Sequence, residues 1–209
     1  MAIIEKKSMR DQCYSVIKEK ILRQEFGLGE FINISELSAE LSVSNTPIRE
    51  ALSLLESDGL VISAPNTRAQ VIEFTKVSTK EIFQTFHILA KGAYELCIKE
   101  NRKDQLCRLL AKSLAEQELH LAGKDYYQFT HATVGFDRAM FEALNNTQLL
   151  AVFDNLLNIM FLLYRTNHQK NDLERSRSIS DHRRILDAII SGNHARVEQL
   201  QDEHYNSKW

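Results

Sequence analysis

The scarcity of chain-breaking residues constrains this sequence more than any other feature. Seven glycines and two prolines make nine of 209 residues, about 4%, against roughly 12% in an average protein. Sandwiches, barrels and parallel sheets need many tight turns, so this composition favours long helices. With 44% hydrophobic and 26% charged residues, the chain has the composition of a globular protein with a core. We therefore expect a mainly α protein whose length suits two domains.

The first third of the chain predicts three helices and a small β-hairpin. Helices are expected at residues 9–25, at 34–41 and from Ser44 to Gly59; Asn33 and Glu36 have the spacing of a capping box, and Ser44 is expected to cap the third helix. A turn at 64–67 lies between runs rich in β-branched residues at 60–62 and 71–72, which predicts the hairpin, the only strand candidate. Two short helices with a three-residue turn, followed by a hairpin, describe a winged helix-turn-helix. In that motif the second helix presents its first residues to base edges in the major groove of DNA.

Six further helices with short connections are expected after the hairpin. They cover residues 78–100, 103–122, 125–143, 147–166, 173–191 and 194–207, and the capping-box spacing of Ser78 and Glu81 opens the first of them. Helices joined by short loops form antiparallel bundles. We therefore predict a winged helix-turn-helix domain at residues 1–76, followed by an antiparallel all-helical domain at 77–209.

Four stretches of sequence, two in each half of the chain, carry a family resemblance. ELSAELSVSNTPIREAL at 36–52 and LESDGLV at 55–61 resemble the DNA-binding domain of the GntR family of bacterial transcription regulators. FDRAMFEALNNTQLL at 136–150 and DHRRILDAI at 181–189 resemble the FCD domain, the helical effector-binding domain of that family's FadR-type branch. The resemblance implies a homodimer that binds a palindromic operator, most commonly as a repressor, and responds to a small molecule bound in the helical domain.

The resemblance also assigns the DNA-contacting residues. They are Ser35, Ser44, Asn45, Thr46 and Arg49 in the helix-turn-helix and Arg68 near the tip of the wing. Arg49 suits a base contact because a guanidinium pairs bidentately with guanine O6 and N7; a salt bridge with a neighbouring carboxylate is the structural alternative.

The DNA-binding half departs from the family in composition and in sequence. Family members usually have Arg where Asn45 stands and often where Ser35 stands. They have a Gly-rich turn where this chain has residues 66–68. Asn suits adenine, so we expect a shifted operator preference. Residues 1–76 hold nine Lys/Arg against eleven Asp/Glu, so DNA contacts must come from a few locally placed cations rather than from bulk charge.

Three polar residues in the second half lie on otherwise apolar helical stripes: Asp137, His182 and His204. Polar groups on inward faces need partners. An Asp–His hydrogen-bonded cluster in the core satisfies that need, and so does a divalent metal ion, because two imidazoles and a carboxylate suit Zn, Ni, Mn or Fe. The two alternatives remain open from the sequence.

The resemblance bears on the metal site without deciding it. FCD domains often bind a metal through Asp, a His four residues later and two further His separated by 22 residues. His182 and His204 keep the last spacing, but Thr133 stands where the Asp is expected and Asp137 where the first His is expected. Thr133 is a poor ligand, which weakens the predicted affinity.

The effector pocket is predicted at Phe86, Met160 and Tyr164. Family members often carry Arg where Phe86 stands and Glu where Ala90 stands, so the cavity is less cationic than that of a typical carboxylate-binding relative. The effector is therefore expected to be a carboxylate or a more apolar small molecule. Core packing is the alternative role of these aromatic residues.

The remaining observations concern compartment and enzyme activity. The longest apolar run, 159–164, is far shorter than the roughly 20 residues that a bilayer requires, and the first residues lack the apolar stretch of a signal peptide. We therefore expect a cytoplasmic protein without membrane association. The sequence has no GxSxG, P-loop or HExxH motif. The alternative function is a metal-dependent binding module or metalloenzyme built on Asp137, His182 and His204.

Overall fold

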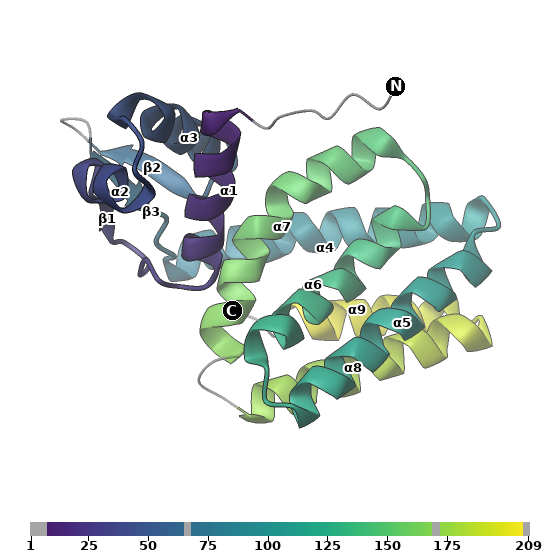
Figure 1. Cartoon of the computed structure of the whole chain (residues 1–209). Helices are drawn as coiled ribbons and strands as arrows, with labels where there is room; N and C mark the ends of the chain where they lie inside the picture. The colour runs from purple at the N-terminus through teal and green to yellow at the C-terminus, as the bar shows by residue number, and fades with distance from the viewer. Residues whose placement is uncertain (1–7, 65–67, 169–171, 207–209) are drawn as a thin grey trace, which may run out of the picture. The chain divides into compact units, whose positions relative to one another are not determined.

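The computed structural model describes residues 8–64, 68–168 and 172–206. It divides into two compact units, Met1–Phe74 and Thr75–Trp209, each of which is described by itself. The described residues form nine helices and three strands (Figure 1). The mainly α fold predicted from the sequence is therefore confirmed.

Unit 1 consists of three helices and a small antiparallel sheet. Its elements are α1 (Met9–Leu22), β1 (Phe31–Ile32), α2 (Ile34–Leu41), α3 (Asn45–Ser57), β2 (Val61–Ala64) and β3 (Arg68–Val71). The strand order is β1-β3-β2, with Phe31 opposite Gln70 and Val61 opposite Val71. The hairpin was expected to hold the only strands, so β1 is an addition. Two residues give too short a pattern for sequence periodicity to detect.

Local backbone conformation and one side-chain hydrogen bond fix the ends of the helices in unit 1. Ser42 adopts a left-handed conformation (φ 54°) after α2, and Ser42 to Ser44 form the predicted three-residue turn before α3. Gly59 (φ 72°) follows α3, and the Leu60 amide donates to the Leu55 carbonyl, which is the Schellman pattern that favours glycine. The Tyr14 hydroxyl of α1 donates to Asp58, 2.5 Å away, at the end of α3. Burial and the neighbouring Asp58 charge raise the pKa of Tyr14, so the donor stays neutral.

Several predicted helix ends need correction. The first helix ends at Leu22, three residues before the predicted end, because Gln24 takes positive φ. Asn33 caps α2 by accepting from the Ser35 and Glu36 amides, but the Glu36 carboxylate accepts from the Asn33 side chain instead of completing a capping box with its backbone. Ser44 occupies the N-cap position of α3 without a side-chain cap hydrogen bond.

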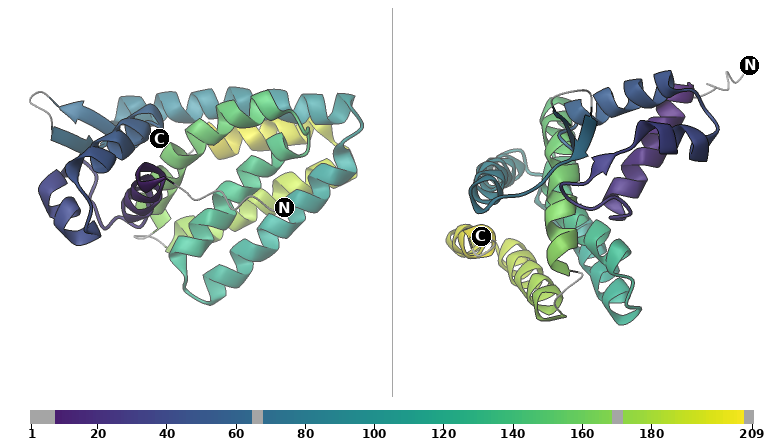
Figure 2. Two further views of the ribbon diagram at one scale, coloured as in Figure 1. Left: turned by 45° about the horizontal axis from the view of Figure 1, so that its top comes forward. Right: turned by 90° about the vertical axis from the view of Figure 1, so that its left-hand side faces the viewer.

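Unit 2 is a bundle of six helices. They are α4 (Lys76–Lys99), α5 (Lys103–Ala122), α6 (Tyr126–Glu142), α7 (Thr147–His168), α8 (Asp172–Ser191) and α9 (His194–Asn206). Helix α5 packs against α6 and α8, and α9 packs against α8 and runs along α4 (Figure 2). The first helix begins two residues before the predicted start, because the capping box is formed by Thr75 and Ser78 rather than by Ser78 and Glu81. Two overlapping Ser/Thr signals compete there, and the earlier one caps the helix.

Helix α7 differs from expectation in its apolar character. Among the described residues it is the one helix long and apolar enough to cross a membrane by length and composition, with 33% of its most apolar window buried. Polar residues such as Asp154 and Asn155 interrupt its apolar runs, so each run is short. The helix as a whole is nevertheless apolar. In this structure α7 packs against α6, α4 and α8, and buries Phe153, Met160 and Tyr164. Its second half, from Met160 to Tyr164, therefore contributes to the core of unit 2.

The capping pattern of unit 1 predicts a difference between two substitutions. Asn33→Ala removes a side chain that caps α2, and we expect it to lower the free energy of unfolding by ~0.5–2 kcal/mol. Ser44→Ala removes a hydroxyl without a cap bond and should cost less than about 0.5 kcal/mol. Urea denaturation followed by circular dichroism measures both. An equal loss in the two variants would contradict the capping assignment.

Candidate functional site

Helix α3 has one buried face and one exposed face. Ile48, Ala51, Leu52 and Leu55 are buried, and α3 packs on α1. Asn45, Thr46 and Arg49 lie on the exposed side, together with Ser44 just before the helix. The apolar spacing that holds the helix in unit 1 therefore leaves its first turn and Arg49 accessible from solvent.

The structure groups five of the six predicted DNA-contacting residues around surface hollows. Ser35, Arg49 and Arg68 line one hollow between α2, α3 and the sheet, and Ser44 and Thr46 line a second. Asn45 is exposed as the first residue of α3. Nothing in the described part of the chain forms an ion pair with Arg49, so the salt-bridge alternative has no partner there.

The wing contributes its cation from β3. Arg68 is exposed at the first position of the strand, with its guanidinium carbon 6.0 Å from the centre of the Phe31 ring. Arg49 and Arg68 also line a further hollow together with Glu56. Two arginines from elements 19 residues apart in the sequence thus share one surface of unit 1. The tip at 66–67, where the family pattern changes, lies outside the described residues.

In unit 2 the three predicted metal ligands converge. Asp137 of α6, His182 of α8 and His204 of α9 are buried, and one ligand atom from each lies within 4.8 Å of the others. The apolar stripes on which the sequence placed them therefore face one another. His182 also stacks on Phe136, with ring centres 3.9 Å apart and planes 2° from parallel, so its ring plane is fixed by packing.

Neighbouring polar groups determine which imidazole nitrogens are available. The Gln117 amide nitrogen donates to the Ala132 carbonyl, 3.4 Å away, and this places its oxygen 2.9 Å from Nδ1 of His182. The Asp181 carboxylate lies 3.2 Å from Nδ1 of His204. Both oxygens accept hydrogen bonds, which assigns a proton of each ring to Nδ1 and, in the neutral imidazole, the lone pair to Nε2. Such acceptors behind the ring are the usual second contacts of metal-binding histidines.

Asp137 accepts two hydrogen bonds from tyrosines. The Tyr164 hydroxyl of α7 lies 3.1 Å from one carboxylate oxygen, and the Tyr205 hydroxyl of α9 lies 2.9 Å from the other. Burial and the nearby carboxylate raise the pKa of both tyrosines well above the usual value, so they remain neutral donors. A carboxylate offers about four lone pairs, which is more than the two tyrosine hydroxyls require.

The donor set therefore fits a divalent metal ion with three protein ligands. Two imidazole Nε2 atoms and one carboxylate meet within a buried volume, and three ligands leave coordination positions for water or a small-molecule oxygen. Thr133 is buried, but its hydroxyl donates to the Phe129 carbonyl within α6. It does not replace the carboxylate that FCD domains often have at that position.

The three residues of the predicted effector pocket lie in the core. Phe86 packs against Phe153 and Tyr205, with ring centres 5.5 and 4.9 Å away. Met160 is also fully buried, and the Tyr164 ring packs against Phe83 while its hydroxyl reaches Asp137. Their apolar packing borders the cluster of Asp137, His182 and His204 through Tyr164.

Sequence reasoning missed the residues that position the cluster. Gln117, Asp181 and Tyr205 were not predicted, although Asp181 directly precedes His182 and Tyr205 directly follows His204. Adjacent residues on a helix point about 100° apart, so adjacency did not indicate a shared site. Asp181 in fact contacts the histidine of the neighbouring helix, which only the packing of α8 on α9 reveals.

A winged helix-turn-helix joined to a helical domain with a buried polar cluster defines a class of DNA-binding transcription regulators. The family profiles agree with this class: the one described as bacterial regulatory proteins, gntR family, matches residues 9–71, and the FCD domain matches residues 81–207. Because the second match alone covers more than half of the chain, this protein belongs to the GntR family of bacterial transcription regulators and carries an FCD effector domain.

Curated relatives include regulators of known operons. The HTH-type transcriptional regulator YdhC of Bacillus subtilis is 27% identical over 200 residues, covering 93% of this chain and 87% of that protein. The gluconate operon transcriptional repressor of Bacillus licheniformis is 29% identical over 184 residues, covering 85% and 73%. These relatives are regulators, so the alternative of a metalloenzyme is not favoured.

Solved structures share the fold. A transcriptional regulator GntR from Rhodococcus sp. RHA1 superposes with a TM-score of 0.79 at 17% identity, covering 96% of this chain and 95% of that one. McbR/YncC of E. coli gives a TM-score of 0.77 at 22% identity, covering 97% and 95%. At these identities the likeness supports the fold alone. The predicted winged helix-turn-helix followed by a helical domain is confirmed.

Proposed function

We propose that this protein is a cytoplasmic repressor that binds a palindromic operator as a homodimer and responds to a small molecule bound in unit 2. The observation that carries the proposal is the exposed Arg49 on α3, a helix whose opposite face is buried in unit 1. The relatives named as repressors of gluconate and D-xylose utilization operons support the sign of regulation.

DNA recognition is assigned to six residues. Arg49 contacts a base edge, Ser44 and Thr46 position the start of α3, and Arg68 contacts the backbone or the minor groove from the wing. Ser35 and Asn45 occupy positions where family members carry Arg. Asn45 suits the adenine N6 and N7 edge rather than guanine, so the preferred operator differs from the usual one of the family.

The arginine roles predict separate effects on DNA binding. Arg49→Ala should cost ~1–3 kcal/mol per half-site and relax the preference at one base pair, whereas Arg68→Ala should weaken binding uniformly across sequences. Gel shifts with the DNA upstream of the gene, at low salt, measure both. Few phosphate contacts by an acidic domain also predict a shallow dependence of affinity on salt.

Arg23→Ala is the matched control for these variants. Arg23 lies at the end of α1 and pairs with Glu19, 2.7 Å away, on the surface of unit 1. We expect unchanged affinity and unchanged sequence preference. If Arg49→Ala behaved like Arg23→Ala, α3 would not be the recognition helix. Absence of any specific shift with the intact protein would contradict the proposed function as a whole.

Dimerisation is assigned to unit 2. A monomer would contact one half-site, and two-fold symmetric operators are bound by symmetric dimers. Light scattering of the full chain at micromolar concentration should give about twice the 24.1 kDa of one chain. A monomeric mass that DNA leaves unchanged would contradict this assignment.

The effector site is assigned to the region around Asp137. Phe86, Met160 and Tyr164 provide an apolar side, and a divalent ion (Zn, Ni, Mn or Fe) held by Asp137, His182 and His204 would supply positive charge for a donor oxygen. A ligand with one oxygen donor and an apolar body, such as a small carboxylate, matches that chemistry. The buried donor set with both Nδ1 atoms hydrogen-bonded supports the metal.

Elemental analysis tests the metal assignment. The full chain, purified without chelator or affinity tag, should contain about one equivalent of a transition metal, and His182→Ala should lose it because one of three ligands is removed. His131→Ala is the control, since His131 is an exposed residue of α6. Occupancy should fall on acidification, because a protonated imidazole has no lone pair. Less than about a tenth of an equivalent, with no thermal shift on adding Zn²⁺, Ni²⁺ or Mn²⁺, would leave the Asp–His cluster as a metal-free core network.

A further inference from the structure

Arg175 of α8 is a buried arginine with unsatisfied donors. Its side chain is 3% exposed, and its Nε and Nη1 atoms have no hydrogen-bond partner within the described chain. A guanidinium stays charged at all physiological pH values and carries five N–H donors. Buried donors of this kind are costly to leave without acceptors, so the position calls for an explanation.

The known contacts of Arg175 satisfy only part of the guanidinium. Its carbon lies 3.6 Å from the centre of the Tyr126 ring, which is close cation–π stacking. Nη2 donates to the Asp172 carboxylate one turn earlier. Asp172 is 82% exposed, so water competes for its carboxylate, and the contact occupies only one of the three guanidinium nitrogens.

A second unsatisfied group lies beside it on the same helix. Ser178 is completely buried, and its hydroxyl has no hydrogen-bond partner in the part of the chain that the structure describes. Residues three apart on a helix are neighbours, with Cβ atoms about 5–6 Å apart. Arg175 and Ser178 thus place buried donors on one side of α8, and Arg175 lies in its first turn, where the helix dipole also favours a negative charge.

We propose that Arg175 and Ser178 bind an oxyanion, the carboxylate or phosphate group of a small molecule. Nε and Nη1 of Arg175 and the Ser178 hydroxyl donate to its oxygens, which satisfies the buried donors that Asp172 does not reach. Such charge-assisted hydrogen bonds are the strong ones in proteins.

Helix α8 carries both the anion site and His182, one of the three proposed metal ligands. Arg175, Ser178 and His182 follow one stripe of α8, and all three are buried. Seven residues separate Arg175 from His182, which is about 10 Å along the helix axis. A bifunctional effector has one anionic end at Arg175 and an oxygen donor towards His182. Assignment of the oxyanion to the effector rests on the proposed function, whereas the anion site itself does not.

Calorimetric titration of the full chain tests the site. The protein is first treated with chelator, so that a metal ion does not bind the probes, and is then titrated with inorganic phosphate and, separately, with acetate. We expect saturable binding of at least one probe; tighter phosphate binding identifies a phosphate ligand and tighter acetate binding a carboxylate. Binding of neither probe would overturn the proposal.

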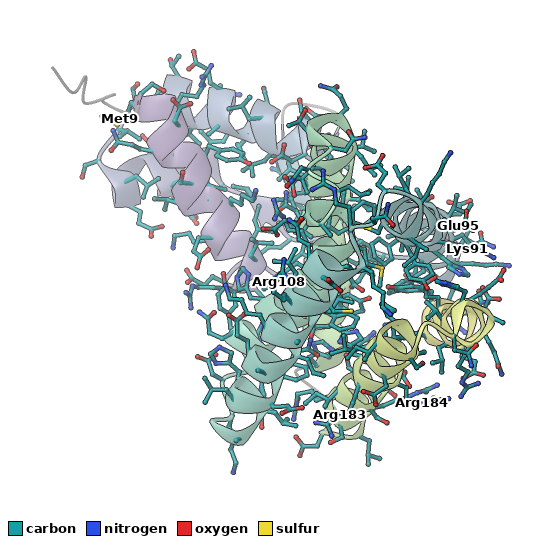
Figure 3. The ribbon with its side chains drawn as sticks, turned by 90° about the vertical axis from the view of Figure 1, so that its right-hand side faces the viewer. Met9, Lys91, Glu95, Arg108, Arg183 and Arg184 are labelled. Carbon is teal, nitrogen blue, oxygen red and sulfur yellow. The ribbon has the colours of Figure 1, made fainter. Side chains whose placement is uncertain are left out.

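Matched variants distinguish a ligand site from a structural contact. Arg175→Met should abolish binding, and Ser178→Ala should weaken it about tenfold, the value of one hydrogen bond to a charged group. Arg183→Met is the control: Arg183 points outward from the same helix and pairs with Glu118 (Figure 3). If Arg175 merely fastens α8 to Tyr126, Arg175→Met lowers stability and leaves anion binding unchanged, which would overturn the proposal.

A third variant covers the case in which Arg175→Met does not fold. Asp172→Asn removes the competing carboxylate at an exposed position, so it should tighten anion binding several-fold; unchanged or weaker binding would overturn the site.

Gel shifts run in parallel separate this inference from the proposed function. Protein that binds operator DNA without binding either anion contradicts only the inference, and protein that binds an anion without binding DNA contradicts only the proposed function.

Discussion

A single buried carboxylate organises the helical half of this protein. Asp137 is completely buried, and moving an isolated ionised carboxylate out of water costs far more than one protein's net stability. Its charge is stabilised by donors from other helices: Tyr164 of α7 and Tyr205 of α9, with His182 of α8 and His204 of α9 close by. The positions of α6, α7, α8 and α9 are therefore tied to the requirements of one charge.

The two histidines near Asp137 are themselves held by hydrogen-bond partners. Gln117 of α5 and Asp181 of α8 accept from the two histidines, so a fifth helix joins the network, and α8 supplies both one ligand and the group that orients the ligand on α9. Sites held on rigid elements with hydrogen-bonded supporting residues have well-defined geometry. A ligand bound at this cluster, as proposed, would change contacts shared by five helices, and this would be a physical means of favouring one arrangement of the bundle over another.

In the DNA-binding half, α3 has one buried face and one exposed face. Buried Ile48, Leu52 and Leu55 hold α3 in unit 1, and the remaining face is left to Arg49 and the first turn. Residues 1–76 hold more acidic than basic residues, so the proposed DNA contacts are assigned to a few positioned cations. Arg68 joins Arg49 because β3 pairs with both β1 and β2 and lies at the same surface hollow. Under the proposed function, fit and base contacts rather than bulk charge provide the specificity.

The sequence by itself determined the helices, the turn and the family. The scarcity of Gly and Pro and the apolar spacing predicted α2 and α5 residue for residue. The long string of family residues around Arg49 identified the helix-turn-helix. The sequence also identified Asp137, His182 and His204, because polar residues on apolar stripes stand out against a period of 3.6. Tertiary structure decided the rest. Strand β1 is too short for periodicity, the competing caps at Thr75 and Ser78 differ by local geometry, and Gln117, Asp181 and Tyr205 become neighbours of the cluster only when α5, α8 and α9 pack. A one-dimensional pattern records which face of a helix is buried; which side chains meet across buried faces depends on the rotation and register of one helix against another.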